Sequence, residues 1–124
     1  MAGFEITVHR KERILEVRYP QHPTEADVLE YLRAARAAID ADLAGRPWRC
    51  LVDQRRLLVM PPELATEVST LNEYAEAKGM ARCARVVASA VGALQVARIA
   101  KSVQSAPVKA FQDRATAMQW LAEK

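Results

Sequence analysis

A short apolar strand that runs directly into a helix recurs along this chain, and this recurrence constrains the fold more than any other feature. The last copy is the clearest. Residues 108–111 are apolar enough for a buried strand, and Asp113 can cap a helix in which Ala117, Met118 and Leu121 recur at helical spacing. Strands that alternate with helices predict an α/β fold with a mostly parallel sheet.

Two earlier copies of the unit precede this one. Strands are predicted over residues 48–53 and 82–89, because both segments are short and apolar. Helices are predicted from residue 62 or 63 to Gly79 and over residues 93–103. A longer helix is predicted to begin at Thr24, to carry its apolar stripe as far as Leu43 and to stop at Gly45.

The chain opens with a different pattern. Residues 4–8 and 13–19 each alternate apolar and polar side chains, with a polar turn between them, which predicts an antiparallel hairpin. We therefore expect one α/β domain over residues 1–124. Its central sheet is mixed but mostly parallel, with an N-terminal antiparallel hairpin and about four helices.

The composition excludes several classes of protein. The 124 residues contain no apolar run near the roughly 20 residues of a membrane span, and no signal peptide is visible, so a cytoplasmic location is expected. The net charge of +3 is spread along the chain, and the few aromatic residues suit a core. We therefore expect no nucleic-acid partner and no membrane span.

The two cysteines, Cys50 and Cys83, both fall in predicted buried strands. Their expected state is two reduced core thiols, and a disulfide or a shared metal is the alternative. There is no CxxC motif and no histidine near either cysteine in the sequence, so neither a metal nor another cofactor is expected.

Taken together, the segments resemble the SpoIIAA-like family, which is related in fold to the STAS domains of anti-sigma-factor antagonists. The opening hairpin, residues 51–53 before a loop that holds Pro61 and Pro62, residues 85–89 before a helix, and the ending from residue 108 to 121 carry this resemblance. It implies a mixed sheet with helices largely on one face. It also implies a likeness in outline to SEC14-type lipid-binding domains, and hence an apolar ligand pocket.

In signalling STAS domains, a serine near the start of the helix after the central strand is phosphorylated. This chain departs from that pattern, because no Ser or Thr lies between Asp53 and Glu63. The phosphoserine switch is therefore not expected here.

The predicted binding site lies where the strand over residues 48–53 ends, since ligands favour the carboxyl ends of parallel strands. Asp53 is either an acceptor at the site or a residue that caps the loop, and Arg55 and Arg56 either hold an anion or lie solvated in a turn. The apolar stretch that follows either covers the core or forms an exposed patch. The candidate binding residues for a partner or ligand are Asp53, Arg55, Arg56, Leu57, Leu58, Met60 and Leu64.

No constellation of catalytic residues is visible, so we expect no enzymatic activity. Ser89 is interpreted as a helix cap, and His9 and His22 as surface histidines on turns. The favoured function is a non-catalytic regulatory or protein-interaction module whose partner is another protein or a second copy of the chain, as a homodimer. The alternative is a carrier or sensor of an apolar or amphiphilic, lipid-like molecule held between helices and sheet.

Overall fold

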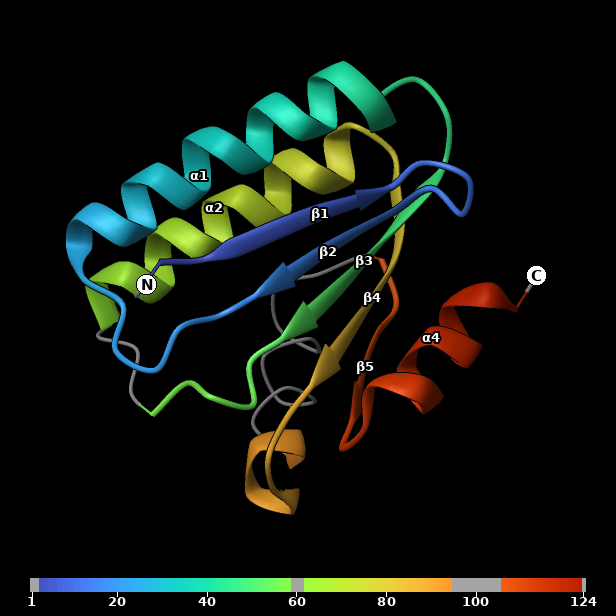
Figure 1. The fold of residues 1–124 in the computed structure, drawn as a ribbon. Helices are drawn as coiled ribbons and strands as arrows, with labels where there is room; N and C mark the ends of the chain where they lie inside the picture. The colour runs from blue at the N-terminus through green and yellow to red at the C-terminus, as the bar shows by residue number, and fades with distance from the viewer. Residues whose placement is uncertain (1–2, 59–61, 95–105, 124) are drawn as a thin grey trace.

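Five strands form one mixed sheet in the order β1-β2-β3-β4-β5 in the computed structural model, which describes residues 3–58, 62–94 and 106–123 (Figure 1). The strands are β1 (Glu5–His9), β2 (Ile14–Arg18), β3 (Trp48–Asp53), β4 (Met80–Val86) and β5 (Val108–Phe111). The first two pair antiparallel, and every other neighbouring pair is parallel. This arrangement confirms the predicted α/β fold with a mixed sheet and an N-terminal hairpin.

The helix after the hairpin begins where the sequence predicts. α1 spans Glu25–Ala38, and Thr24 and Asp27 cap it reciprocally, each accepting a backbone N–H of the other at 3.0 Å. The helix continues as a π-helical turn, η1 (Ile39–Leu43), which the periodicity did not reveal, and Gly45 follows at a φ of 100°.

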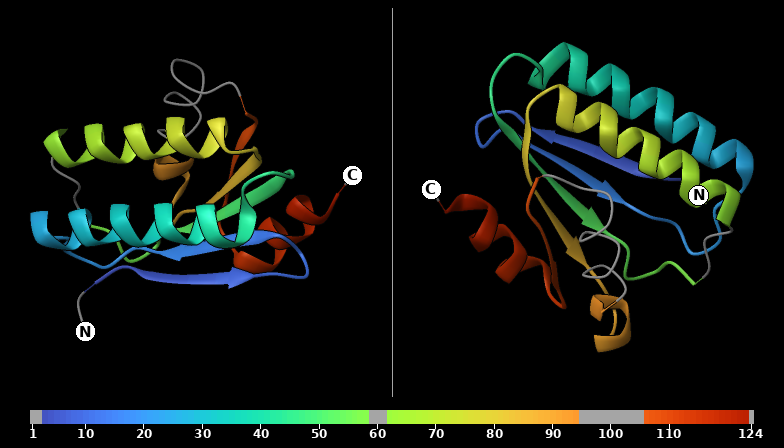
Figure 2. Two further views of the ribbon diagram at one scale, coloured as in Figure 1. Left: turned by 90° about the horizontal axis from the view of Figure 1, so that it is seen from above. Right: turned by 180° about the vertical axis from the view of Figure 1, so that it is seen from behind.

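The second helix, α2 (Pro62–Ala77), lies beside α1 on one face of the sheet (Figures 1 and 2). Gly79, at a φ of 108°, reverses the chain after α2, so β4 begins at Met80. The strand therefore starts and ends earlier than the predicted range of residues 82–89. A helical stretch covers residues 90–94, and Ser89 caps it by accepting the N–H of Gly92 at 3.2 Å. The rest of the helix predicted to residue 103 lies outside the described residues.

The closing helix, α4 (Arg114–Ala122), packs against the other face of the sheet, so the expectation that the helices lie largely on one face is only partly met. Asp113 caps it as predicted, accepting the N–H of Thr116 at 2.8 Å. At its other end, Arg82 donates to the carbonyl of Trp120 at 2.7 Å, and Arg49 donates to the carbonyl of Leu121. These bonds satisfy carbonyls that a helix end leaves without partners.

Alternation along the strands divides the core between the two faces. Toward α1 and α2, the strands contribute Leu15, Val17, Tyr19, Cys50, Val52 and Cys83. Toward α4, they contribute Ile14, Leu51, Ala84 and Val86, which meet Ala117 and Leu121 of the helix. No helix in the described ranges is both long and apolar enough to cross a bilayer.

Two glycines offer a matched test of the turns that end the helices. Ala at Gly45 meets no atom within 4 Å, whereas the new methyl at Gly79 would lie 3.2 Å from the carbonyl oxygen of Arg46. We expect Gly45→Ala to lower the free energy of unfolding by about 1–2 kcal/mol through the positive φ alone, and Gly79→Ala to lower it further. Urea denaturation measures both changes, and equal losses would contradict the role of the contact with Arg46.

Candidate functional site

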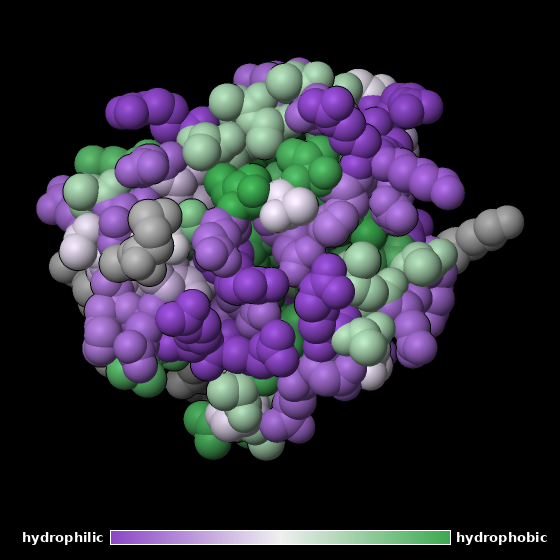
Figure 3. Space-filling view, viewed as in Figure 1, coloured by the Kyte–Doolittle hydropathy of each residue, from purple (hydrophilic) through white to green (hydrophobic). Residues whose placement is uncertain are grey.

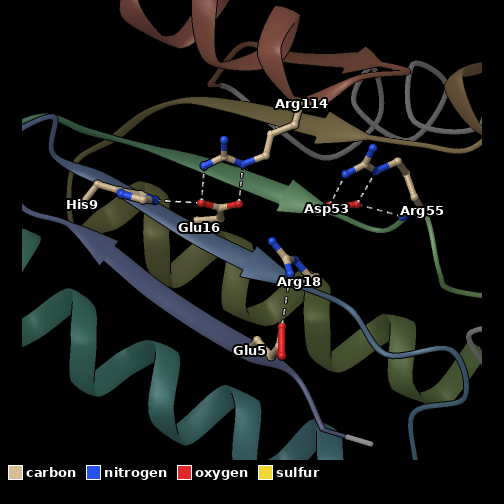
Figure 4. A network of polar contacts seen from close by, with 7 residues as sticks. All are labelled: Glu5, His9, Glu16, Arg18, Asp53, Arg55 and Arg114. Carbon is tan, nitrogen blue, oxygen red and sulfur yellow. Dashed lines mark hydrogen bonds and ion pairs between the residues drawn. The ribbon is translucent and has the colours of Figure 1, made fainter. Parts of the chain in front are cut away.

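Charged side chains gather on the α4 face of the sheet, beside the region that the helix covers (Figure 4). Alternation along β2 sends Glu16 and Arg18 to this face with Ile14, and alternation along β3 sends Asp53 there with Leu51. Each of these polar groups has a charged partner, namely Arg114 for Glu16, Glu5 for Arg18 and Arg55 for Asp53.

Glu16 is one of two buried carboxylates in this group, with 7% of its surface exposed. Arg114, the first residue of α4, donates to both of its oxygens at 2.8 Å in a bidentate pair. These hydrogen bonds outweigh the cost of burial and lower the pKa of Glu16 to about 2. The pair thereby fastens the N-terminus of α4 to β2.

His9 is the second partner of Glu16, and here the sequence-based interpretation was wrong. Its Nε2 lies 2.7 Å from Glu16 Oε1, and the residue ends β1 in a half-buried position instead of lying on a surface turn. The antiparallel register, which pairs His9 with Ile14 and Thr7 with Glu16, places histidine and carboxylate on one face. His22, by contrast, is exposed as expected.

Asp53 lies at the carboxyl end of β3 with 4% of its surface exposed. Its oxygens accept the Nε and Nη2 of Arg55 at 3.0 and 2.8 Å, and the backbone N–H of Arg55 at 3.2 Å. Burial would raise the pKa of Asp53, but the hydrogen bonds and charge of Arg55 lower it below its ordinary value. The geometry is that of a carboxylate that caps the loop.

Arg56 lines a pocket of about 180 Å³ beside the end of β2. No hydrogen bond or ion pair joins its guanidinium to the described residues. Arg18, on the same pocket, lies 3.6 Å from Glu5 in an ion pair between exposed groups. The complete lining consists of Gly3, Glu5, Arg18, Tyr19, Pro20, Gln21, His22 and Arg56.

The apolar stretch after Arg56 contains one residue that covers the core and one that is exposed. Leu57 is half-buried and packs against the core on the α1 and α2 side. Leu58 is 60% exposed, and its N–H donates to the carbonyl of Gln21 at 3.1 Å. Met60 lies outside the described residues, and although Leu64 belongs to α2, its side chain is likewise not described.

The sequence analysis did not find Glu16 and Arg114, because 98 positions separate them. Only the hairpin alternation gave a signal, since it placed Glu16 on the face opposite Leu15 and Val17. Within the described ranges, no group of three or more His, Cys, Asp or Glu side chains could hold a metal ion.

Comparison with known proteins identifies the architecture. The model of the SpoIIAA-like family matches residues 14–122. A solved structure, described as an uncharacterized protein from the DUF3478 family with a SpoIIAA-like fold from Shewanella loihica PV-4, superposes with a TM-score of 0.80. The two chains share 19% sequence identity, and the match covers 98% of this chain and 95% of the other, so it bears on the fold alone. The comparison with curated proteins gives no match.

The lowered pKa of Glu16 predicts a dependence of stability on pH. Folding favours the ionised carboxylate, so its contribution is complete above the ordinary pKa of 4.5 and is lost as the pH falls toward 2. The difference between these pKa values corresponds to about 3 kcal/mol. We expect Glu16→Gln to lower the free energy of unfolding at neutral pH. The difference in this free energy between wild type and variant should become smaller as the pH falls from about 5 to about 2.

Urea denaturation across this pH range measures the effect. Glu12→Gln is the matched control, because Glu12 is an exposed carboxylate in the same hairpin. If the difference in free energy of unfolding between wild type and Glu16→Gln were the same over the whole pH range, the ion pair between β2 and α4 would not account for it.

Proposed function

The chain belongs to the SpoIIAA-like family, and we propose that it works as a regulatory or protein-interaction module whose partner is a second copy of itself. The proposed binding surface is the edge of the sheet where β3 and β4 end. It comprises the exposed side chains of the loop over residues 54–58 and of the helical stretch over residues 90–94. We call this surface the carboxyl edge.

The distribution of exposed apolar side chains carries this proposal. Four large apolar side chains are conspicuously exposed in the described part of the chain, namely Leu29, Leu58, Val91 and Leu94. Three of the four follow β3 or β4, which are neighbouring parallel strands with Asp53 beside Val86 at their ends. Exposed apolar residues also appear at the lower end of Figure 3, where the 90–94 helix lies in Figure 1.

The arginines of the same loop suit such an interface. Arg55 and Arg56 are exposed beside Leu58, and Arg55 is held in place by Asp53. Arginine is enriched in protein–protein interfaces, because its apolar stem can be buried while its guanidinium remains hydrogen-bonded. An arginine already fixed by a carboxylate also loses little side-chain freedom on association.

Substitution of single exposed leucines tests the carboxyl edge. We expect wild-type protein to dimerise, and Leu58→Asp to weaken the dimer at least tenfold, because it introduces a charge into an apolar contact; tenfold corresponds to about 1.4 kcal/mol. Leu29→Asp is the matched control, since Leu29 is an exposed leucine of α1 and is not among the residues that define the carboxyl edge. Sedimentation equilibrium measures association, and circular dichroism verifies that each variant is folded.

A wild-type chain that remains monomeric at every accessible concentration would overturn self-association as its mode of action. Equal weakening by Leu29→Asp and Leu58→Asp would show that the dimer does not use the carboxyl edge.

A second candidate function, a carrier or sensor of amphiphilic anions, is favoured by one specific observation. The hydroxyl of Tyr19 is buried under the α1 and α2 face, and its proton has no acceptor among the described residues. Although burial alone would lower the pKa of Arg85, charge interactions with Tyr19 and Cys83 raise it, so this guanidinium remains a cation on the same face. A hydroxyl that can donate its proton, next to a cation, suits a carboxylate head group.

The apolar surroundings of this pair would suit the tail of such a ligand. Tyr19 packs edge-on against Phe4 at 5.0 Å and near Tyr31 at 6.0 Å, measured between ring centroids. Val68 and Leu71 of α2 are buried in this same core.

Decanoate serves as the probe for the second function. We expect titration calorimetry to detect binding to wild type, and Arg85→Met to weaken it at least tenfold through loss of the only cation that faces Tyr19 on the described strands. Tyr19→Phe should weaken binding less, because it removes one neutral hydrogen bond of about 1 kcal/mol. Arg33→Met, an exposed residue of α1, is the control. Absence of any heat of binding to wild type would count against this function.

A further inference from the structure

The two cysteines of the chain lie directly opposite each other in the middle of the sheet. Cys50 of β3 and Cys83 of β4 are paired in the parallel register, and both belong to the core beneath α1 and α2. Both are free thiols, with 8% and 0% of their surfaces exposed. Since the chain has only these two cysteines, any disulfide within one molecule must join them.

The spacing of neighbouring strands permits such a bond. Paired residues on adjacent strands lie about 4.8 Å apart, and disulfides join Cα atoms separated by about 4.4–6.8 Å. Because the two side chains leave the sheet on the same face, their thiols meet and hydrogen-bond to each other.

The surroundings distinguish the two thiols. The hydrogen bond with Cys50 and the positive charge of Arg85 lower the pKa of Cys83 to about 7, whereas the same hydrogen bond and burial raise the pKa of Cys50. The charged or titratable groups that influence the pair are Tyr19, Tyr31, Glu76 and Arg85. One member of the pair is thus a thiolate near neutral pH, while the other keeps its proton.

We propose that Cys50 and Cys83 form a modification site, at which a peroxide converts the folded chain to an intramolecular disulfide. The Cys83 thiolate attacks one oxygen of hydrogen peroxide, the O–O bond breaks, and hydroxide leaves to give a sulfenic acid. The Cys50 sulfur then attacks the oxidised sulfur, the S–O bond breaks, and the thiol proton leaves with the hydroxyl as water. Overall, two thiols and one peroxide yield one disulfide and two waters.

The location of the pair determines the character of this disulfide. Peroxide is hardly larger than water, and it reaches Cys83 through local opening of the covering layer. A disulfide is broken again by thiol–disulfide exchange with an external thiol reductant. The proposed site is thus reversible, and it is independent of the carboxyl edge.

Intact-mass measurement tests the proposal directly. Native wild-type protein is treated with hydrogen peroxide and then with a maleimide in concentrated urea. We expect a monomer that has lost two hydrogens, takes up no maleimide and regains two reactive thiols after treatment with dithiothreitol. Cys50→Ala and Cys83→Ala should each show no such loss of hydrogens. The measurement on wild-type protein decides the proposal by itself, so the test remains valid even if these variants fold poorly.

The variant Arg85→Met tests whether the charge of Arg85 activates Cys83. Loss of the nearby cation should slow oxidation at pH 7 at least about fivefold, because less of Cys83 is then a thiolate. Arg82→Met is the matched control, since Arg82 lies on the same strand but points to the α4 face. An unchanged rate in Arg85→Met would overturn the activating role of Arg85.

Three results would overturn the site itself. They are thiols that remain reduced until urea unfolds the chain, disulfides that join two molecules, and oxygen addition to one cysteine without loss of the other thiol.

Discussion

Burial of the central strands on both faces is the constraint on which the rest of the structure depends. Every residue of β3 except Arg49 is buried, so its apolar side chains must be covered on both faces of the sheet. Cys50 and Val52 meet α1 and α2, while Leu51 meets α4. β2 and β4 pair with β3 in parallel, and both helix layers pack against its side chains, so β3 lies at the centre of the arrangement.

The opening hairpin carries charged side chains on the α4 face of the sheet. Beyond α4 no helix in the described part of the chain covers this face of the sheet, and Glu16 is shielded by Arg114 and His9. The resulting ion pair does what apolar contacts do elsewhere, because it joins the helix to the sheet. The binding proposals use other places, namely the exposed loop ends and the enclosed pair of Tyr19 and Arg85.

Much of the fold was predictable because its signals are local. The cap formed by Thr24, the stops at Gly45 and Gly79, the strand over residues 48–53 and the cap at Asp113 each depend on a few neighbouring residues. The site was predictable only in part. Asp53 and Arg55 are only two positions apart in the chain, so their pairing is local, but His9 was misassigned because its partner depends on the register of the hairpin.

The sequence by itself determined the order of strands and helices, the mixed sheet and the family, because alternation, capping and glycine stops act over short distances. Tertiary structure alone decided which groups meet. It brought Arg114 to Glu16 across 98 positions, set Cys50 against Cys83, and separated the half-buried Leu57 from the exposed Leu58. The physical reason is that a side chain's partner depends on strand register and on where each helix layer ends, and neither is written in local spacing.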